Sequence, residues 1–313
     1  MKKYTDINDI NNLASFIKEA MILKSDPFKY ESLGKRKTLI MLFFNSSLRT
    51  RLSTEKAAKN LGMEVLTLNI NDAWNFEFED GTIMNAQSAE HIKEAAQVLS
   101  EYADIIAVRA FPELKDKSKD ESEYILNALL KYATVPIVNM ESSTAHPLQA
   151  LADAITIEEF NSSKRPKVVL SWAPHPKPLP HAVANSFIKM MQRMDADFVI
   201  THPEGYELNS EIVGQTPVLY DQTEALQDAD FVYVKNWSSY ENYGQVLSKD
   251  ANWMMTKEKL GNAKFMHCLP VRRNVVVEDA VLDSSSSIVI EQAGNRTYAA
   301  QIVLKKILES ETI

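Results

Sequence analysis

Residues 38–51 decide the fold of the first half of the chain and read TLIMLFFNSSLRTR. The apolar part predicts a buried strand over Leu39–Phe44, because it is short, continuous and followed by polar residues. The Ser/Arg/Thr cluster that follows opens an amphipathic helix, which we expect to end at Gly62. Such a strand-to-helix turn directs free backbone N–H groups and the positive end of the helix dipole to one place. With hydroxyls and guanidinium groups added, the segment predicts an anion site, most naturally for phosphate.

Composition limits the remaining possibilities. The chain has 313 residues, which suits two domains, and its formal net charge of −8 argues against a nucleic-acid partner. No apolar stretch approaches the ~18 residues of a membrane span, so no membrane partner is expected. The single cysteine, Cys268, excludes an internal disulfide and fits a reducing cytoplasm. Metal-binding motifs such as CxxC and HExxH do not occur, so neither a metal nor a cofactor is expected.

Short β-rich runs alternate with helical patterns along the whole chain, which predicts an α/β fold with two doubly wound parallel sheets. The expected strands are Leu39–Phe44, Val65–Leu68, Ile105–Arg109, Val135–Val138, Val168–Trp172, Phe198–Thr201, Phe231–Val234, Lys264–His267 and Ile288–Ile290. The expected helices are Thr50–Leu61, Ser88–Tyr102, Glu121–Ala133, Leu148–Phe160, Ala182–Gln192 and Asn295–Leu308. The first domain should comprise 1–145 and be joined by the C-terminal helix 295–313, and the second should comprise 146–294. The active site is expected in the cleft between them.

Polar side chains follow almost every expected strand. In doubly wound sheets, ligands bind beyond the carboxyl ends of the strands, so these residues should converge on one edge. Arginines, histidines and glutamine are among them. The segments are 47–51, 109, 146–149, 172–177, 235–237, 267–270 and 291–296.

Four of these segments form ordered motifs. S-x-R-T-R at 47–51, H-P-x-Q at 146–149, H-C-L-P at 267–270 and E-x-A-x-N-R at 291–296 resemble the aspartate/ornithine carbamoyltransferase family, over essentially the whole chain. The resemblance implies a homotrimer with active sites shared between subunits and carbamoyl phosphate as the first substrate. A phosphate-ligand-binding protein of the same fold without turnover is the alternative from another functional class.

The resemblance also assigns roles to residues of this chain. The phosphate ligands would be Ser47, Leu48 through its backbone, Arg49 and Thr50. The donors to the carbonyl oxygen would be Thr50, Arg109 and His146. The carbamoyl NH₂ would be held by Gln149 and the backbone carbonyl of Leu269, while Arg296 would join the carbamoyl phosphate site. Cys268 would lie beside the attacking amine, although a lone cysteine is also commonly an inert buried thiol.

The acceptor site departs from the ordinary ornithine pattern, D-x-W-x-S-M-G. Lys235 stands where that pattern has the aspartate expected to hold a free α-ammonium. A lysine would repel an ammonium and attract a carboxylate, which indicates an Nα-acylated ornithine rather than free ornithine, the remaining alternative. The proline-rich loop Trp172–Pro180 resembles the N-acetylornithine and N-succinylornithine branch. Within that branch His175 would donate to the acyl or carboxylate group, Glu141 would accept from the amide N–H, and Trp74 would reach in from a neighbouring subunit.

The identity of the acyl group depends on Glu90, in a loop around residues 80–92 that resembles the family's subunit-crossing loop. N-acetylornithine enzymes carry glutamate at the position that Glu90 resembles, whereas N-succinylornithine enzymes carry proline. A glutamate near a succinyl carboxylate is repelled by about 4 kcal/mol at ~4 Å and an effective dielectric constant of ~20. Glu90 therefore favours the acetyl substrate, although the rest of the chain is closer to the succinyl enzymes. The plain alternative is a solvated acid at a helix start.

Overall fold

The computed structural model describes residues 1–70 and 75–311, and the chain divides into two compact units. Unit 1 comprises Met1–Glu113, Ser118–Leu148 and Arg296–Ile313, and unit 2 comprises Leu114–Lys117 and Gln149–Asn295. Three helices contain a boundary between the units, namely α4 (Lys117–Glu121), α6 (Pro147–Phe160) and α12 (Val289–Glu311).

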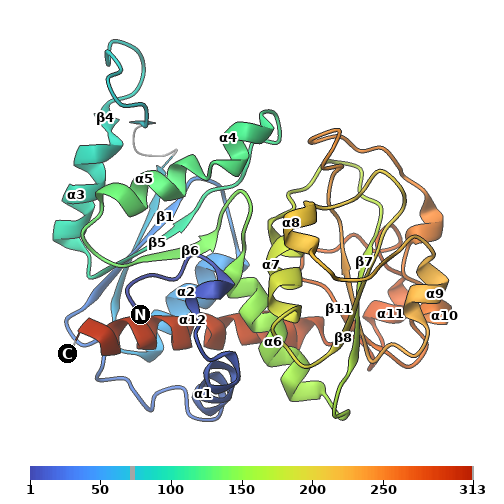
Figure 1. Cartoon of the computed structure of the whole chain (residues 1–313). Coiled ribbons are helices and arrows are strands. Elements are labelled where there is room, and N and C mark those ends of the chain that lie inside the picture. The colour runs from blue at the N-terminus through green and yellow to red at the C-terminus, as the bar shows by residue number, and fades with distance from the viewer. Residues whose placement is uncertain (71–74, 312–313) are drawn as a thin grey trace. The chain divides into compact units, whose positions relative to one another are not determined.

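Unit 1 is built on a four-stranded parallel sheet with strand order β2-β1-β5-β6. Its strands are β1 (Thr38–Phe43), β2 (Glu64–Asn69), β5 (Ile105–Arg109) and β6 (Ile137–Glu141). Its other elements are η1 (Ile7–Asp9), α1 (Leu13–Ser25), α2 (Arg49–Asn60), α3 (Ile92–Tyr102), α5 (Tyr124–Tyr132) and a ribbon of β3 (Phe76–Glu77) and β4 (Glu90–His91). Helices α3 and α5 cover one face of the sheet, and α2 and α12 lie on the other (Figure 1). The predicted doubly wound arrangement is confirmed here.

Unit 2 contains a five-stranded parallel sheet with strand order β11-β10-β7-β8-β9. Its strands are β7 (Lys167–Trp172), β8 (Asp197–Thr201), β9 (Val218–Leu219), β10 (Phe231–Lys235) and β11 (Lys264–Met266). Its helices are α7 (Ala182–Met191), α8 (Ser210–Val213), α9 (Gln222–Leu226), η3 (Ala251–Trp253), α10 (Lys257–Leu260) and α11 (Asp279–Leu282). Alternate residues of β7 enter separate cores, since Val168 and Leu170 pack with α7 whereas Val169 packs with α9 and α10.

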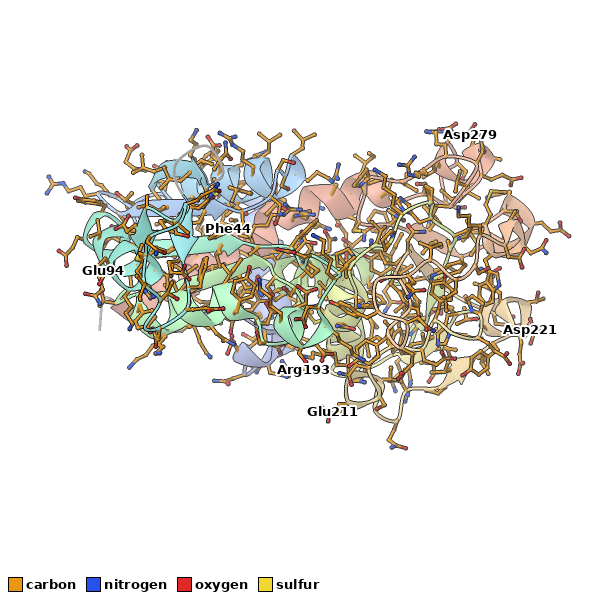
Figure 2. All side chains as sticks on the ribbon, turned by 90° about the horizontal axis from the view of Figure 1, so that it is seen from above. Phe44, Glu94, Arg193, Glu211, Asp221 and Asp279 are labelled. Carbon is orange, nitrogen blue, oxygen red and sulfur yellow. The ribbon has the colours of Figure 1, made fainter. Side chains whose placement is uncertain are left out.

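Several helices of the described chain begin with a side-chain N-cap. Asp221, labelled in Figure 2, accepts from the backbone N–H groups of Thr223 and Glu224 at the start of α9. Thr256 caps α10 in the same way. In helix α2 Leu48 occupies the N-cap position and no side chain caps it, as is also the case in α5, α7 and α11. A helix N-terminus left in that state has free donors for a ligand.

Strand order reverses once in each sheet. In unit 1 the reversal lies between β1 and β5, and in unit 2 it lies between β7 and β10. Crossover connections leave in opposite directions at such a point, which opens a crevice at the carboxyl ends of the two strands. The sheets therefore place residues 44–49 beside Arg109, and Trp172 beside Lys235.

One expected strand is wrong. Ile288–Ile290 is not a strand, because α12 begins at Val289 and the first helical hydrogen bond runs from Gln292 N to Ile288 O. Pairing with β11 is limited to a bridge between Phe265 and Ser287. The β-branched triplet favours a strand locally, but the helix that follows it extends back into the triplet.

The expected helix Ser88–Tyr102 begins later than predicted, at Ile92. Glu90 and His91 pair with β3 instead, and His91 Nδ1 accepts from Lys93 N at 3.2 Å. The histidine cap therefore sets the start of α3.

No helix in residues 1–70 and 75–311 combines the length and apolar character needed to cross a membrane.

Candidate active site

The N-terminus of α2 lies where the sequence predicts an anion site. The first turn of the helix contains no acidic residue, and Arg49 is its first residue. Cations at a helix N-terminus are unfavourable unless an anion is bound there, because the helix dipole is positive at that end. Ser47 and Arg49 are half-buried, whereas the side chain of Leu48 is exposed, so that Leu48 offers only its backbone to a ligand.

Thr50 and Arg296 meet beside this N-terminus. Both are buried, and Arg296 Nη2 donates to Thr50 Oγ1 at 2.6 Å. A guanidinium group has donors only, so the threonine oxygen is the acceptor and its own proton is directed elsewhere. Thr50 therefore retains a donor for a ligand, and Arg296 adds positive charge at the same place.

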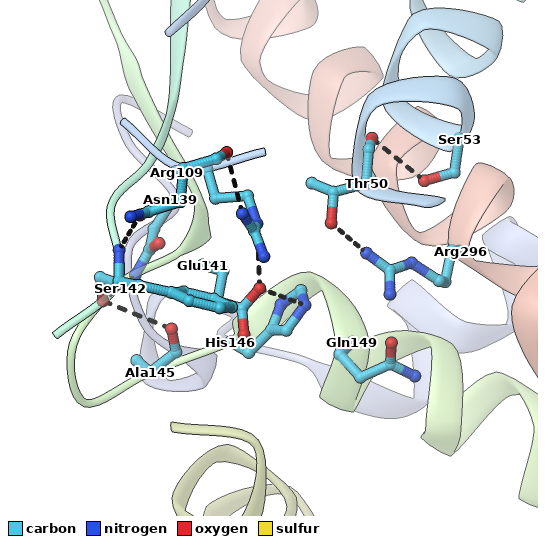
Figure 3. Close-up of polar contacts among 12 residues, drawn as sticks. Thr50, Ser53, Arg109, Asn139, Glu141, Ser142, Ala145, His146, Gln149 and Arg296 are labelled. Atoms are coloured by element: carbon cyan, nitrogen blue, oxygen red, sulfur yellow. Dashed lines mark hydrogen bonds and ion pairs between the residues drawn. The ribbon is translucent and has the colours of Figure 1, made fainter. Parts of the chain in front are cut away.

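Arg109, Glu141 and His146 form a buried cluster at the ends of β5 and β6 (Figure 3). Arg109 Nε donates to Glu141 Oε2 at 3.1 Å, and His146 Nε2 lies 3.5 Å from the same oxygen. Arg109 Nη1 donates to the carbonyl oxygens of Asn45 and Ser46 at 3.0 and 2.8 Å, which ties the end of β5 to the turn after β1. Of the five guanidinium donors, the two on Nη2 remain for a ligand within the part of the chain that the structure describes.

Glu141 lies at the end of β6, and its role as an acceptor for the substrate amide N–H stays a prediction. Its buried carboxylate holds Arg109 and His146, two of the three expected donors to a carbonyl oxygen. It offsets the positive charge of Arg109 and fixes its direction, because a buried charge is tolerated when it is paired. Unit 1 thus brings together Ser47, Leu48, Arg49, Thr50 and Arg296 at α2, and Arg109, Glu141 and His146 at the next strand ends.

Glu90 lies outside these two groups. Trp74 falls outside the described residues. Glu90 is half-buried in the β3–β4 ribbon, at the end of a segment, 79–87, in which every side chain is exposed. This segment extends away from the sheet of unit 1 (Figure 1).

Lys235 and His175 lie at the point where strand order reverses in unit 2. Lys235 ends β10, is buried, and pairs in register with Trp172 at the end of β7. His175 Nε2 accepts from Arg272 Nε at 3.0 Å. Burial lowers the pKa of His175, the carbonyl of Lys177 opposes that effect, and the charges of Arg272 and Lys235 lower the pKa further. A neutral histidine with two cations nearby suits a carboxylate ligand.

Gln149, Cys268 and Leu269 also belong to unit 2. Gln149 Nε2 donates to Asp153 Oδ1 at 2.7 Å, one turn along α6. Cys268 is a buried free thiol. Leu269 has a positive φ of 54°, a left-handed conformation that is costly for a leucine, and its N–H donates to His267 Nδ1 at 2.9 Å. Backbone outliers of this kind gather at functional sites, which supports the predicted use of the Leu269 carbonyl.

Two residues of the site were not identified from the sequence. Asp153 is fully buried beside Gln149, and its spacing of four residues from Gln149 on a helix was the available signal. Arg272 contacts His175 across 97 residues of sequence, and no local pattern indicates that contact. Among residues 1–70 and 75–311, no group of three or more His, Cys, Asp or Glu side chains is arranged to hold a metal ion.

Comparison with known proteins identifies relatives over the whole chain. Residues 2–159 match the family described as aspartate/ornithine carbamoyltransferase, carbamoyl-P binding domain, and residues 180–307 match its Asp/Orn binding domain. The chain is 53% identical over 315 residues to an N-succinylornithine carbamoyltransferase of Bacteroides thetaiotaomicron, with 99% of each chain covered. It is 37% identical over 313 residues to an N-acetylornithine carbamoyltransferase of Xylella fastidiosa, covering 91% of this chain and 93% of that one.

A solved structure is also similar to this chain in fold and sequence. It is a crystal structure of N-acetyl-L-ornithine transcarbamylase in which one glutamate is replaced by proline, complexed with carbamyl phosphate and N-succinyl-L-norvaline. Its TM-score to this chain is 0.91 at 36% identity, covering 98% of this chain and 100% of that one.

Proposed function

Because the chain belongs to the aspartate/ornithine carbamoyltransferase family, we propose that it transfers the carbamoyl group of carbamoyl phosphate to the side-chain amine of an Nα-acyl-L-ornithine. The products are an Nα-acyl-L-citrulline and phosphate, which assigns the enzyme to arginine biosynthesis. The observation that carries the proposal is the uncapped, cationic N-terminus of α2, with Thr50 held beside it by Arg296. We further propose that residues 1–145 with 295–313 bind carbamoyl phosphate and that residues 146–294 bind the acylornithine.

The donor substrate is held by backbone and guanidinium groups. Its phosphate accepts from the N–H groups at residues 47–50 and from Arg49, which satisfies the helix N-terminus. Its carbonyl oxygen accepts from Thr50, Arg109 and His146. These groups are positioned in advance by Arg296 and Glu141, so they stabilise developing charge without reorganising.

The transfer itself needs orientation and charge stabilisation. The neutral side-chain amine attacks the carbonyl carbon, forming a C–N bond and a tetrahedral oxyanion. The bond from carbon to the bridging phosphate oxygen then breaks, phosphate leaves with the electron pair, and the amine loses one proton. Cys268 lies beside the expected amine position and is our candidate for binding that amine. Gln149 Oε1 and the Leu269 carbonyl accept from the carbamoyl NH₂.

The acceptor is recognised by positive charge in unit 2. Lys235 is buried at the end of β10, and Arg272 donates a hydrogen bond to His175. An α-carboxylate is attracted to this place, whereas a free α-ammonium is repelled from Lys235. An acylated α-nitrogen carries no charge and avoids that repulsion.

We propose that the acyl group is acetyl, although the 53% identical relative is named an N-succinylornithine enzyme. Glu90 is the reason, because its charge repels a nearby succinyl carboxylate and should lower the affinity for that substrate on the order of a thousandfold. The solved structure with N-succinyl-L-norvaline is of an acetylornithine enzyme that has lost one glutamate. That combination fits a glutamate which excludes the succinyl group.

We also propose a cytoplasmic homotrimer with shared active sites. Exposed leucines lie on α2 and on the adjoining edge strand β2, namely Leu48, Leu52, Leu66 and Leu68. An apolar edge strand invites pairing or coverage by another chain. The exposed segment 79–87 leads into Glu90 and extends from its own unit, as expected of a loop that enters a neighbouring site.

A side-by-side turnover assay with N-acetyl-, N-succinyl- and unmodified L-ornithine tests the proposal. The wild-type enzyme should release phosphate fastest with N-acetylornithine, and Glu90→Pro should shift the preference to N-succinylornithine. Glu90→Gln is the matched control, because it removes the charge and keeps the size. Faster wild-type turnover of N-succinylornithine would show that Glu90 does not select acetyl. Turnover of free ornithine alone would refute the acylated acceptor. Turnover of none of the three compounds would refute the enzymatic activity.

A further inference from the structure

The inference concerns Asp153, a fully buried carboxylate on α6. One of its oxygens, Oδ1, accepts from two side-chain amides. Gln149 Nε2 donates to it at 2.7 Å from the preceding helical turn, and Gln292 Nε2 donates to it at 2.7 Å from 139 residues along the chain. Two hydrogen bonds from amide N–H groups offset part of the cost of burying this carboxylate in its charged form.

The bond to Asp153 fixes which way the amide of Gln149 points. An ionised carboxylate only accepts hydrogen bonds, so the NH₂ group of Gln149 must face it. The oxygen of that amide is thereby directed to the opposite side, where it serves as an acceptor. A Gln149 side chain without this restraint can turn its NH₂ group to the carbamoyl NH₂ and place two donors against each other.

The second bond links Asp153 to the loop 267–270. Gln292 Oε1 accepts from His267 N at 2.9 Å, which independently requires the NH₂ group of Gln292 to face Asp153. The ring of His267 in turn accepts from Leu269 N at 2.9 Å. Leu269 has a positive φ, and its N–H is held by this chain of contacts just before its carbonyl.

We propose that Asp153 is a positioning residue that orients both acceptors for the carbamoyl NH₂, namely Gln149 Oε1 and the Leu269 carbonyl. This inference rests on the proposed function, which supplies the carbamoyl group. Tyr233 lies next to the same carboxylate. Burial, together with Asp153 and Cys268, raises its pKa, so its hydroxyl remains protonated beside the charged carboxylate.

Two substitutions at this position separate orientation from general damage. Asp153→Ala removes the shared acceptor, whereas Asp153→Asn keeps one oxygen that can accept from both amides. We expect Asp153→Ala to lower kcat and carbamoyl phosphate affinity by about tenfold or more, because small misplacements of orienting groups have effects of that size. Asp153→Asn should retain most of the wild-type kcat and most of the carbamoyl phosphate affinity. The affinity for inorganic phosphate should stay within about twofold in each variant, because the phosphate ligands lie on α2 of unit 1.

The measurements are isothermal titration with carbamoyl phosphate and with inorganic phosphate, alongside steady-state turnover with N-acetylornithine. The inference is overturned if Asp153→Ala binds carbamoyl phosphate as tightly as the wild-type protein. It is also overturned if the Ala and Asn variants lose equal amounts of carbamoyl phosphate affinity, or if the affinity for inorganic phosphate falls in parallel. If Asp153→Ala does not fold, Gln292→Leu decides, because it removes the link from Asp153 to His267 and leaves the bond between Asp153 and Gln149. It should lower carbamoyl phosphate affinity several-fold and spare phosphate, and an unchanged affinity refutes the link. Failure of the wild-type enzyme to use any acylornithine is a separate result, which refutes the proposed function.

Discussion

Replacing Thr50 by valine tests the candidate active site most directly. Valine has nearly the shape of threonine but has no hydroxyl, so the change removes one oxygen at the start of α2 and little else. That oxygen accepts from Arg296 at 2.6 Å and is buried, and its proton is therefore free to be donated to a substrate oxygen. Two effects should follow, one on catalysis and one on stability.

The sizes of the two effects follow from the contacts. Loss of one preorganised donor to a developing oxyanion costs about 2.7–4 kcal/mol, which lowers kcat by about 100- to 1,000-fold. Loss of a hydrogen bond to a charged group costs about 1.5–3 kcal/mol of folding free energy. Catalysis should therefore fall by two to three orders of magnitude, while the protein stays folded.

Thr50→Ser is the matched control, because serine keeps the hydroxyl and loses only a methyl group. Its kcat should stay within about fivefold of the wild-type value, since the donor remains. The assay is steady-state formation of N-acetylcitrulline at saturating N-acetylornithine with varied carbamoyl phosphate, together with urea unfolding of all three proteins. If Thr50→Val turned over within about threefold of Thr50→Ser, Thr50 would not donate to the reacting group and the site would be misassigned.

Three further predictions address the remaining charges. Arg49→Ala should lower kcat/KM for carbamoyl phosphate by about 100-fold or more, because a charge-assisted phosphate contact is lost. Arg51→Ala is the control and should change kcat/KM little. Equal effects of the two substitutions on initial rates would contradict the phosphate site. Lys235→Met should raise KM for N-acetylornithine at least about tenfold with little change in the inorganic phosphate affinity, and an unchanged KM would refute the carboxylate contact. Burial lowers the pKa of His202, so the unfolded chain binds more protons below pH ~6.5; the free energy of unfolding should fall as pH drops below that value, and His202→Gln should reduce the slope in urea titrations.

Much of the fold is local enough to be predicted from sequence. Strand β1 is a continuous apolar run followed by the Ser/Arg/Thr cluster, and this pattern indicates both the buried strand and the helix start at Arg49. The strand at Ile288–Ile290 was predicted from the same kind of signal and is wrong, because three β-branched residues cannot outweigh the 23-residue helix that includes two of them. Short apolar runs remain ambiguous between strand and helix for this reason.

The candidate site was predictable where each residue follows its own strand, and not where residues act on one another. Arg109 and His146 were found at strand ends, but their shared contact with Glu141 depends on how the strands align. The bond between Asp153 and Gln292 joins residues 139 apart, and neither residue stands out from its neighbours in sequence. Contacts of this kind are set by tertiary packing and leave no periodic trace.

The proposed function makes acceptor choice depend on few charges, and on that basis overall identity and Glu90 can indicate different acyl groups. Identity of 53% to a succinylornithine enzyme weights every position equally, and most positions maintain two sheets and a carbamoyl phosphate site. A single charge near a charged substrate group changes affinity on the order of a thousandfold, at ~4 Å and an effective dielectric constant of ~20. In the proposed function, Lys235 selects against a free α-ammonium and Glu90 selects against a succinyl carboxylate. Two such positions are enough to distinguish three substrates without any change in the fold, so the acyl group should follow Glu90 rather than the average of the chain.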